Sequence, residues 1–171
     1  MCGIVGLAGG ATERIADMNG QILHRGPDDE GFYRDEANEV VLAMRRLSIL
    51  DVANGHQPMS NRDGSAWVVH NGEIFNSPEL RRGLEARGYV FSTTNSDTEV
   101  LLHLYAEKQE DMLADLNGMF AFVIYDRERG RLFGARDRIG IKPLYYIHQP
   151  GRFAFASELK SLLVLPEVER K

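Results

Sequence analysis

The segment GMFAFVIYD, residues 118–126, constrains the fold more than any other part of the chain. Its alternating positions are apolar on both sides of an extended strand. One side carries Phe120, Phe122 and Ile124, and the other carries Met119, Ala121, Val123 and Tyr125. A strand with two apolar faces has to be covered by other elements on both sides. We therefore expect this strand to lie inside a layered domain.

Other short apolar segments, bounded by turn residues, also predict strands. They are CGIVGLAG, GFY, EVVLAM, RLSILD, AWVVHNG, GRLF and a pair within PLYYIHQPGRFAFAS. Helical spacing and start signals predict four helices, over residues 12–25, 78–88, 96–108 and 158–165. The second has Ser77 as its N-cap and Gly88 as its stop, and the third begins with a capping box formed by Ser96 and Glu99. Strands outnumber helices and both occur in groups, which indicates an α+β fold with mainly antiparallel pairing.

The length and charge of the chain exclude several classes of protein. With 171 residues and 19.2 kDa, the chain suits one domain over 1–171 and is too short for two of ordinary size. A net charge of -5, with acids and bases interspersed, offers no positive surface to nucleic acid. No apolar run reaches the roughly 18 residues that span a bilayer. We expect a cytoplasmic protein with neither nucleic-acid nor membrane partners.

Metal and nucleotide sites lack the residue spacing that they require. The histidines are scattered, and the only cysteine has no second cysteine to share a metal. The sequence GLAGGA lacks the G-x-G-x-x-G order, and no phosphate-binding G-x-x-x-x-G-K-[ST] loop is present. We therefore expect neither a metal nor a cofactor in this domain.

The only cysteine, Cys2, follows the initiator methionine directly. A lone cysteine is most often a small buried hydrophobe, but this position allows another reading. Removal of Met1 would make Cys2 the N-terminal residue, with an α-amino group of pKa about 8 beside a thiol of pKa about 8.5. Such an amine can act as the general base for its own side chain, as in N-terminal nucleophile enzymes.

A thiol that attacks an amide needs partners, and the chain contains candidates for each. In NGE, the Asn71 side-chain amide and the Gly72 N–H could stabilise an oxyanion, although Asn-Gly is also an ordinary turn. Arg46 could bind a carboxylate, and Glu73 and Asp97 could bind an ammonium group. Taken singly, Arg46 is better explained as a surface charge and Asp97 as an acid at a helix N-terminus.

Considered together, these residues fall within motifs that cover nearly the whole chain. In order they are MCGIVG, HRGPDDEGFY, RRLSILD, GHQPM, NGEIFN, SDTEVLLHLY, NGMFAFVIYD, RDRIGIKPLYY and FASELKSLL. The chain thereby resembles the class II glutamine amidotransferase domain of glutamine-hydrolysing asparagine synthetases. Phe75 stands where that family commonly has Tyr, and Ile139 where it commonly has Phe, and both changes preserve bulk and apolarity.

The resemblance implies a four-layer αββα sandwich of two mainly antiparallel sheets, the N-terminal nucleophile (Ntn) hydrolase fold. It also implies a role for each candidate site residue. Cys2 would be the nucleophile after loss of Met1, and Asn71 and Gly72 would form the oxyanion hole. Arg46 would bind the substrate carboxylate, and Glu73 and Asp97 would bind its amino group. The backbone around Leu47 and Leu50 would line the pocket. RDRIGIKPLYY is interpreted as structural and interfacial rather than catalytic.

The same resemblance implies L-glutamine as substrate and ammonia as product. The ammonia would pass to a C-terminal synthetase domain, in which ATP and Mg are expected and aspartate is the expected acceptor. No S-G-G-x-D-S loop of such a domain occurs here, so we interpret the chain as the glutaminase part of a longer protein. A different acceptor and a non-catalytic regulatory relic are the two alternatives, and a homodimer is left open.

Overall fold

The computed structural model describes residues 1–47, 55–166 and 168. Its strands form two sheets, and every pairing between strands is antiparallel. The five-stranded sheet has the order β2 (Asp29–Asp35), β3 (Val40–Arg46), β1 (Gly3–Ala8), β9 (Arg152–Ala156) and β8 (Tyr145–Gln149). The four-stranded sheet has the order β4 (Met59–Ser60), β5 (Ala66–Ile74), β6 (Gly118–Asp126) and β7 (Arg131–Arg136).

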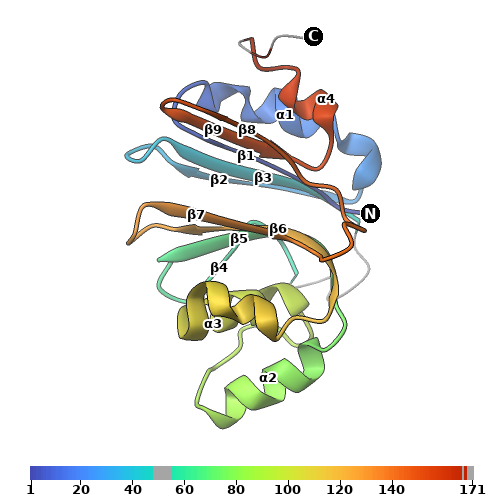
Figure 1. Ribbon diagram of the computed structural model, residues 1–171, viewed down its shortest axis with the longest axis vertical. Helices are drawn as coiled ribbons and strands as arrows, with labels where there is room; N and C mark the ends of the chain where they lie inside the picture. Colours follow the sequence, from blue (N-terminus) through green and yellow to red (C-terminus); the bar gives the residue numbers. More distant parts are fainter. Residues whose placement is uncertain (48–54, 167, 169–171) are drawn as a thin grey trace.

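The helices form the two outer layers of the molecule. The described helices are η1 (Thr12–Arg14), α1 (Ile15–Gly20), η2 (Leu23–Arg25), α2 (Ser77–Ala86), α3 (Asp97–Lys108), η3 (Gln109–Ala114) and α4 (Leu159–Leu162). Figure 1 shows α1 and α4 on the outer face of the five-stranded sheet, and α2 and α3 beyond the four-stranded sheet. The predicted α+β fold and its αββα layering are confirmed. None of the described helices has the length and hydropathy needed to cross a bilayer.

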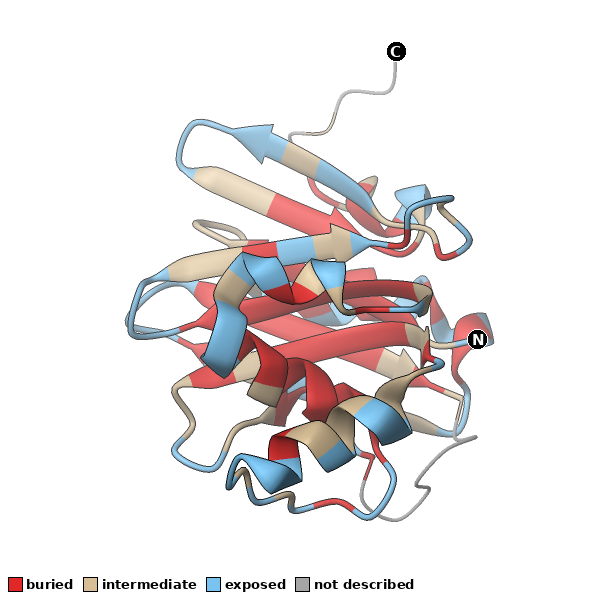
Figure 2. Ribbon diagram, turned by 60° about the horizontal axis from the view of Figure 1, so that its bottom comes forward, coloured by how far each residue is buried: buried red, intermediate tan, exposed pale blue. Residues whose placement is uncertain are grey.

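Three apolar layers hold this sandwich together. Strand β6 contributes to two of them, because Phe122 packs toward α3 while Val123 packs between the sheets. The central layer also contains Ile4, Leu42 and Phe155 from the five-stranded sheet. Figure 2 shows the central strands buried over most of their length, as the doubly apolar pattern predicts. The two sheets therefore meet across an apolar interface that fixes their relative position.

The helix predicted over 12–25 is shorter than its apolar spacing indicates. Only Ile15–Gly20 is α-helical, and 3-10 turns lie on either side of it. A glycine is unfavourable inside a helix by about 1 kcal/mol relative to alanine, which favours termination at Gly20. Of the four apolar residues with helical spacing, Ile15, Met18 and Ile22 pack against the outer face of the five-stranded sheet, whereas Leu23 is 50% exposed.

The two helices beside the four-stranded sheet begin with different chemistry from that predicted. The N-cap of α2 is Asn76 rather than Ser77, and its side chain bonds to Asp115 O and Asn117 N instead of capping the helix. Ser96 is the N-cap of α3, but its side chain makes no capping bond. The predicted capping chemistry is therefore wrong at both helices, because the Asn76 side chain bonds to Asp115 and Asn117 and the Ser96 side chain makes no capping bond.

Candidate active site

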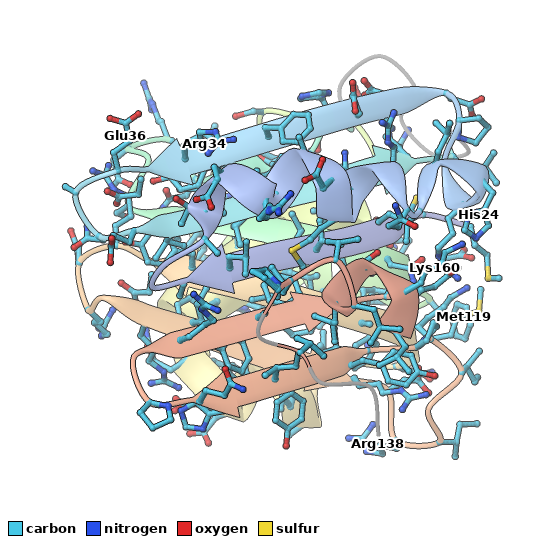
Figure 3. The ribbon with its side chains drawn as sticks, turned by 90° about the horizontal axis from the view of Figure 1, so that it is seen from above. His24, Arg34, Glu36, Met119, Arg138 and Lys160 are labelled. Atoms are coloured by element: carbon cyan, nitrogen blue, oxygen red, sulfur yellow. The ribbon has the colours of Figure 1, made fainter. Side chains whose placement is uncertain are left out.

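A cavity of about 170 Å³ opens at the end of the sandwich that carries the N-terminus. Figure 3 places Met119, which lines this cavity, at the opposite end of the sheets from Arg34 and Glu36. Nearly all of the candidate site residues predicted from the sequence line it: Cys2, Arg46, Leu47, Asn71, Gly72, Glu73 and Asp97. Leu50 lies outside the described residues. Residues far apart in the sequence thus share one cavity.

Cys2 stands immediately before β1, with its side chain at the cavity. Its Sγ lies 3.7 Å from the carbonyl oxygen of Leu47, and its own carbonyl oxygen accepts a 2.9 Å hydrogen bond from Arg25 Nε. Arg25 in turn donates to Glu158 at 3.0 Å. Burial alone would raise the pKa of Glu158, but hydrogen bonds from Arg25, His24 and Lys160 lower it to about 2. An ionised carboxylate therefore orients the arginine that holds the backbone of Cys2.

Asn71 and Gly72 lie inside strand β5, so the alternative reading of an Asn-Gly turn is wrong. They pair with Ala121 and Phe120 of β6. The Nδ2 of Asn71 is buried and has no hydrogen-bond partner among the described residues. A buried N–H group without a partner is costly, so a donor aimed into a cavity is suited to a ligand that supplies the acceptor.

The opposite charges of the cavity come from different layers of the fold. Arg46 ends β3 and is 5% exposed, while Asp97 begins α3 and is 7% exposed. The Oδ2 of Asp97 accepts a 3.0 Å hydrogen bond from Ile74 N, which ties the helix to the end of β5. Glu73 directly precedes Ile74 in β5 and is partly buried. A cation and carboxylates in one small cavity match a ligand that carries both a carboxylate and an ammonium group.

A buried network that the sequence analysis did not assign supports this wall of the cavity. Gln57 accepts from His70 N at 2.6 Å and donates to Thr98 Oγ1 at 3.3 Å. The hydroxyl of Thr98 lies 3.2 Å from His70 Nδ1. Burial lowers the pKa of His70, so the ring is neutral at pH 7. GHQPM and SDTE were noted as motifs, but their shared network is visible only in three dimensions.

Lys142 is another cavity residue without a predicted role. It lies in the RDRIGIKPLYY segment, between β7 and β8, and is 6% exposed. The segment has two kinds of side chain, because Lys142 lines the cavity whereas Ile139 and Ile141 face solvent. No pattern in the sequence of this segment indicated that the lysine would be buried and the two isoleucines exposed. In the described residues, no group of three or more His, Cys, Asp or Glu side chains is arranged to hold a metal.

Comparisons with known proteins identify the family of the chain. The family model described as "Glutamine amidotransferase domain" matches residues 1–171. "Asparagine synthetase [glutamine-hydrolyzing] 1" of Bacillus subtilis is 49% identical over 96% of this chain and 27% of its own length. "Probable asparagine synthetase [glutamine-hydrolyzing]" of Dictyostelium discoideum is 37% identical over 95% of this chain and 30% of its own. The chain thus spans less than a third of either relative.

A solved structure shows the same fold. It is the glutamine phosphoribosylpyrophosphate amidotransferase from B. subtilis complexed with ADP and GMP. The TM-score is 0.78 at 23% identity, and the match covers 95% of this chain and 43% of that one. At this identity the likeness concerns the fold alone, whereas the family model covers the chain from end to end. The chain belongs to the glutamine amidotransferase domain family.

Proposed function

We propose that this chain hydrolyses the side-chain amide of L-glutamine to glutamate and ammonia, with Cys2 as nucleophile once Met1 has been removed. The observation that carries the proposal is the meeting of Cys2, Asn71, Arg46 and Asp97 in one cavity, where Asn71 Nδ2 has no hydrogen-bond partner among the described residues. A nucleophile, an oxyanion donor and partners for both ends of an amino acid are the groups that this reaction needs. A non-catalytic relic would have no reason to retain all of them.

The substrate would lie across the cavity with its charged groups at fixed partners. Arg46 would bind the α-carboxylate, and Glu73 and Asp97 the α-ammonium group. The side-chain amide then extends toward Cys2 and Asn71. Because the positive and negative partners come from β3, β5 and α3, only a ligand of the right length and charge pattern engages all of them.

In the proposed reaction the α-amino group of Cys2 accepts the thiol proton, and Sγ attacks the δ-carbonyl carbon. The negative charge formed on the oxygen is stabilised by Asn71 Nδ2 and the N–H of Gly72. The tetrahedral intermediate collapses as the amine returns the proton to the leaving nitrogen, which departs as ammonia. Water, deprotonated by the same amine, then hydrolyses the thioester and releases glutamate.

We further propose that the ammonia serves a synthetase region that lies beyond this chain, with aspartate as acceptor and ATP with Mg bound in that region. The names of the relatives and their greater length support this. The exposed apolar side chains of Ile139, Ile141, Tyr145 and Tyr146, next to the Lys142 wall of the cavity, suit contact with such a region. A different acceptor would leave the chemistry at Cys2 unchanged.

Ammonia release from glutamine by the purified chain tests the glutaminase. Intact mass first separates chains with and without Met1. We expect the processed chain to release ammonia, and Cys2→Ala and the chain that retains Met1 to release none. A mass gain at Cys2 with a glutamine-like electrophile, absent from Cys2→Ala, gives the same test without turnover. Equal activity of Cys2→Ala and the unsubstituted chain would refute the mechanism.

A further inference from the structure

The cavity contains a buried cation for which the proposed reaction has no use. Lys142 is 6% exposed and lines the same cavity as Cys2. Its Nζ lies 3.5 Å from Met1 Sδ. Within the described part of the chain, no carboxylate lies within ion-pair distance of this ammonium group. A buried lysine without an anionic partner is unusual, because desolvation of the charge is costly.

Side chains hold both the backbone N–H and the backbone carbonyl group of Lys142 by hydrogen bonds. The Oδ2 of Asp137 accepts from Lys142 N at 2.9 Å, and its Oδ1 accepts from Ile141 N at 2.8 Å. Arg136 Nε donates to the carbonyl oxygen of Lys142 at 2.6 Å. Burial alone would raise the pKa of Asp137, but hydrogen bonds from these and other backbone N–H groups outweigh burial and lower the pKa below its usual value. The carboxylate is therefore ionised. The position of Lys142 is therefore built into the fold.

The Met1 contact brings this cation to the residue that is bonded to the nitrogen of Cys2. Met1 is bonded to that nitrogen, and its side-chain sulphur touches Lys142 Nζ. Removal of Met1 would leave a free α-amino group in the cavity that Lys142 also lines. We propose that the ammonium group of Lys142 keeps the α-amino group of Cys2 unprotonated and favours the thiolate of Cys2 at neutral pH. Lys142 thereby acts through Cys2 as a positioning residue, and this inference rests on the proposed function.

Like charges close together disfavour the protonated amine, and an opposite charge favours the thiolate, so both effects of Lys142 have the same direction. The charge of Lys142 also acts on another residue that lines the cavity, His70. Burial lowers the pKa of His70, the negative charge of Asp97 raises it, and the positive charge of Lys142 lowers it. Among the described residues, Arg25 and Arg46 are also near Cys2, but Arg25 is paired with Glu158, and the proposed substrate carboxylate would neutralise Arg46. Glu73 and Asp97 would likewise be matched by the substrate ammonium group.

The test uses the fact that Cys2 is the only cysteine of the chain. The rate of alkylation by iodoacetamide, followed by intact mass across pH 5–10 on the processed chain, reports the thiolate of Cys2 without any turnover. We expect Lys142→Met to raise the midpoint of this profile by about 1 pH unit, because one nearby charge is lost. Lys142→Arg keeps the charge and should keep the midpoint. Lys108→Met removes a distant surface lysine and is the matched control.

The pH dependence of ammonia release gives the second reading. The acid limb of kcat/KM should move to higher pH by a similar amount in Lys142→Met, and stay in place in Lys142→Arg and Lys108→Met. Coincident alkylation profiles for Lys142→Met and the unsubstituted chain would overturn the proposal about Lys142. Absence of ammonia release from the processed, unsubstituted chain would instead overturn the glutaminase proposal, and the alkylation profiles would still decide the role of Lys142.

Discussion

Gly72 combines two requirements of the site in one residue. Its φ of +154° lies where side chains are disfavoured, and a Cβ there would come 2.1 Å from the carbonyl oxygen of Met119. Strands β5 and β6 can pair across this point only because the side chain is absent. The same close pairing fixes the direction of the Gly72 N–H and of the neighbouring Asn71 amide. Sheet geometry and oxyanion geometry are therefore coupled at Gly72.

Gly72→Ala should therefore destabilise the chain and impair the chemistry together. We expect a loss of about 3 kcal/mol or more in the free energy of unfolding, because backbone atoms have to move apart. Gly130 is the control, since it also has a positive φ but has open space at its Cβ position. Gly130→Ala should cost only about 1 kcal/mol. Urea unfolding and ammonia release measure both, and equal effects of the two substitutions would contradict this account.

The sequence predicted the charged and nucleophilic residues of the cavity better than the residues around them. Cys2 and Asp97 belong to motifs with an evident chemical use, and both line the cavity. His70 and Lys142 line it too, but their partners lie far away along the chain. A buried network depends on which elements become neighbours, and no local pattern contains that information. The roles assigned to these residues remain predictions.

At the scale of elements, the entry to α3 shows how a correct boundary can have a different cause. Glu99 was expected to bond back to Ser96, but its carboxylate accepts from Ser92 N at 2.6 Å and from Thr93 N at 2.8 Å. The chain before the helix thus folds back onto its first turn, which carries Asp97. A capping-box pattern specifies the residue types, whereas the path of the preceding loop decides which backbone N–H groups come within hydrogen-bond distance of the Glu99 carboxylate.

Glu99→Gln tests this anchor through its pH dependence. Burial would raise the pKa of Glu99, but hydrogen bonds from Ser92 and Thr93, together with the His103 ring 3.7 Å from the carboxylate, lower it from 4.5 to about 2. A lowered carboxylate pKa stabilises the fold fully above pH 4.5, and this contribution disappears as the pH falls toward 2. We expect Glu99→Gln to lose about 2 kcal/mol at pH 7 relative to the unsubstituted chain, with the difference vanishing near pH 2.

Denaturant unfolding between pH 2 and pH 7 measures this difference. Glu107→Gln is the control, because Glu107 lies on the same helix and pairs with Arg87 at the surface. A surface ion pair contributes less than about 1 kcal/mol, so Glu107→Gln should change stability little at any pH. A loss in Glu99→Gln that stays constant down to pH 2 would show that the lost contribution does not depend on ionisation.

At the scale of the whole molecule, the site is assembled across the interface between the two sheets. Cys2 directly precedes β1 and Arg46 ends β3, both strands of the five-stranded sheet, whereas Asn71 and Gly72 belong to β5 of the four-stranded sheet. The distance from nucleophile to oxyanion donors therefore depends on how the sheets pack, and the apolar layer between them acts as the support of the site. The doubly apolar segment 118–126 predicted that layer from the sequence, because period-two patterns report burial directly.

Two buried leucines separate this effect from general loss of stability. Leu42 lies between the sheets, and Leu84 lies between the four-stranded sheet and its outer helices, and neither is exposed. Alanine at either position should cost about 2–5 kcal/mol. Below the melting temperature of both variants, Leu42→Ala should lower kcat/KM for glutamine by about tenfold, because a displacement of under 1 Å between reacting groups has effects of this order. Leu84→Ala should keep kcat/KM within about twofold, since its cavity does not separate the sheets. Equal losses of kcat/KM in the two variants would mean that catalysis follows overall stability and not the packing between the sheets.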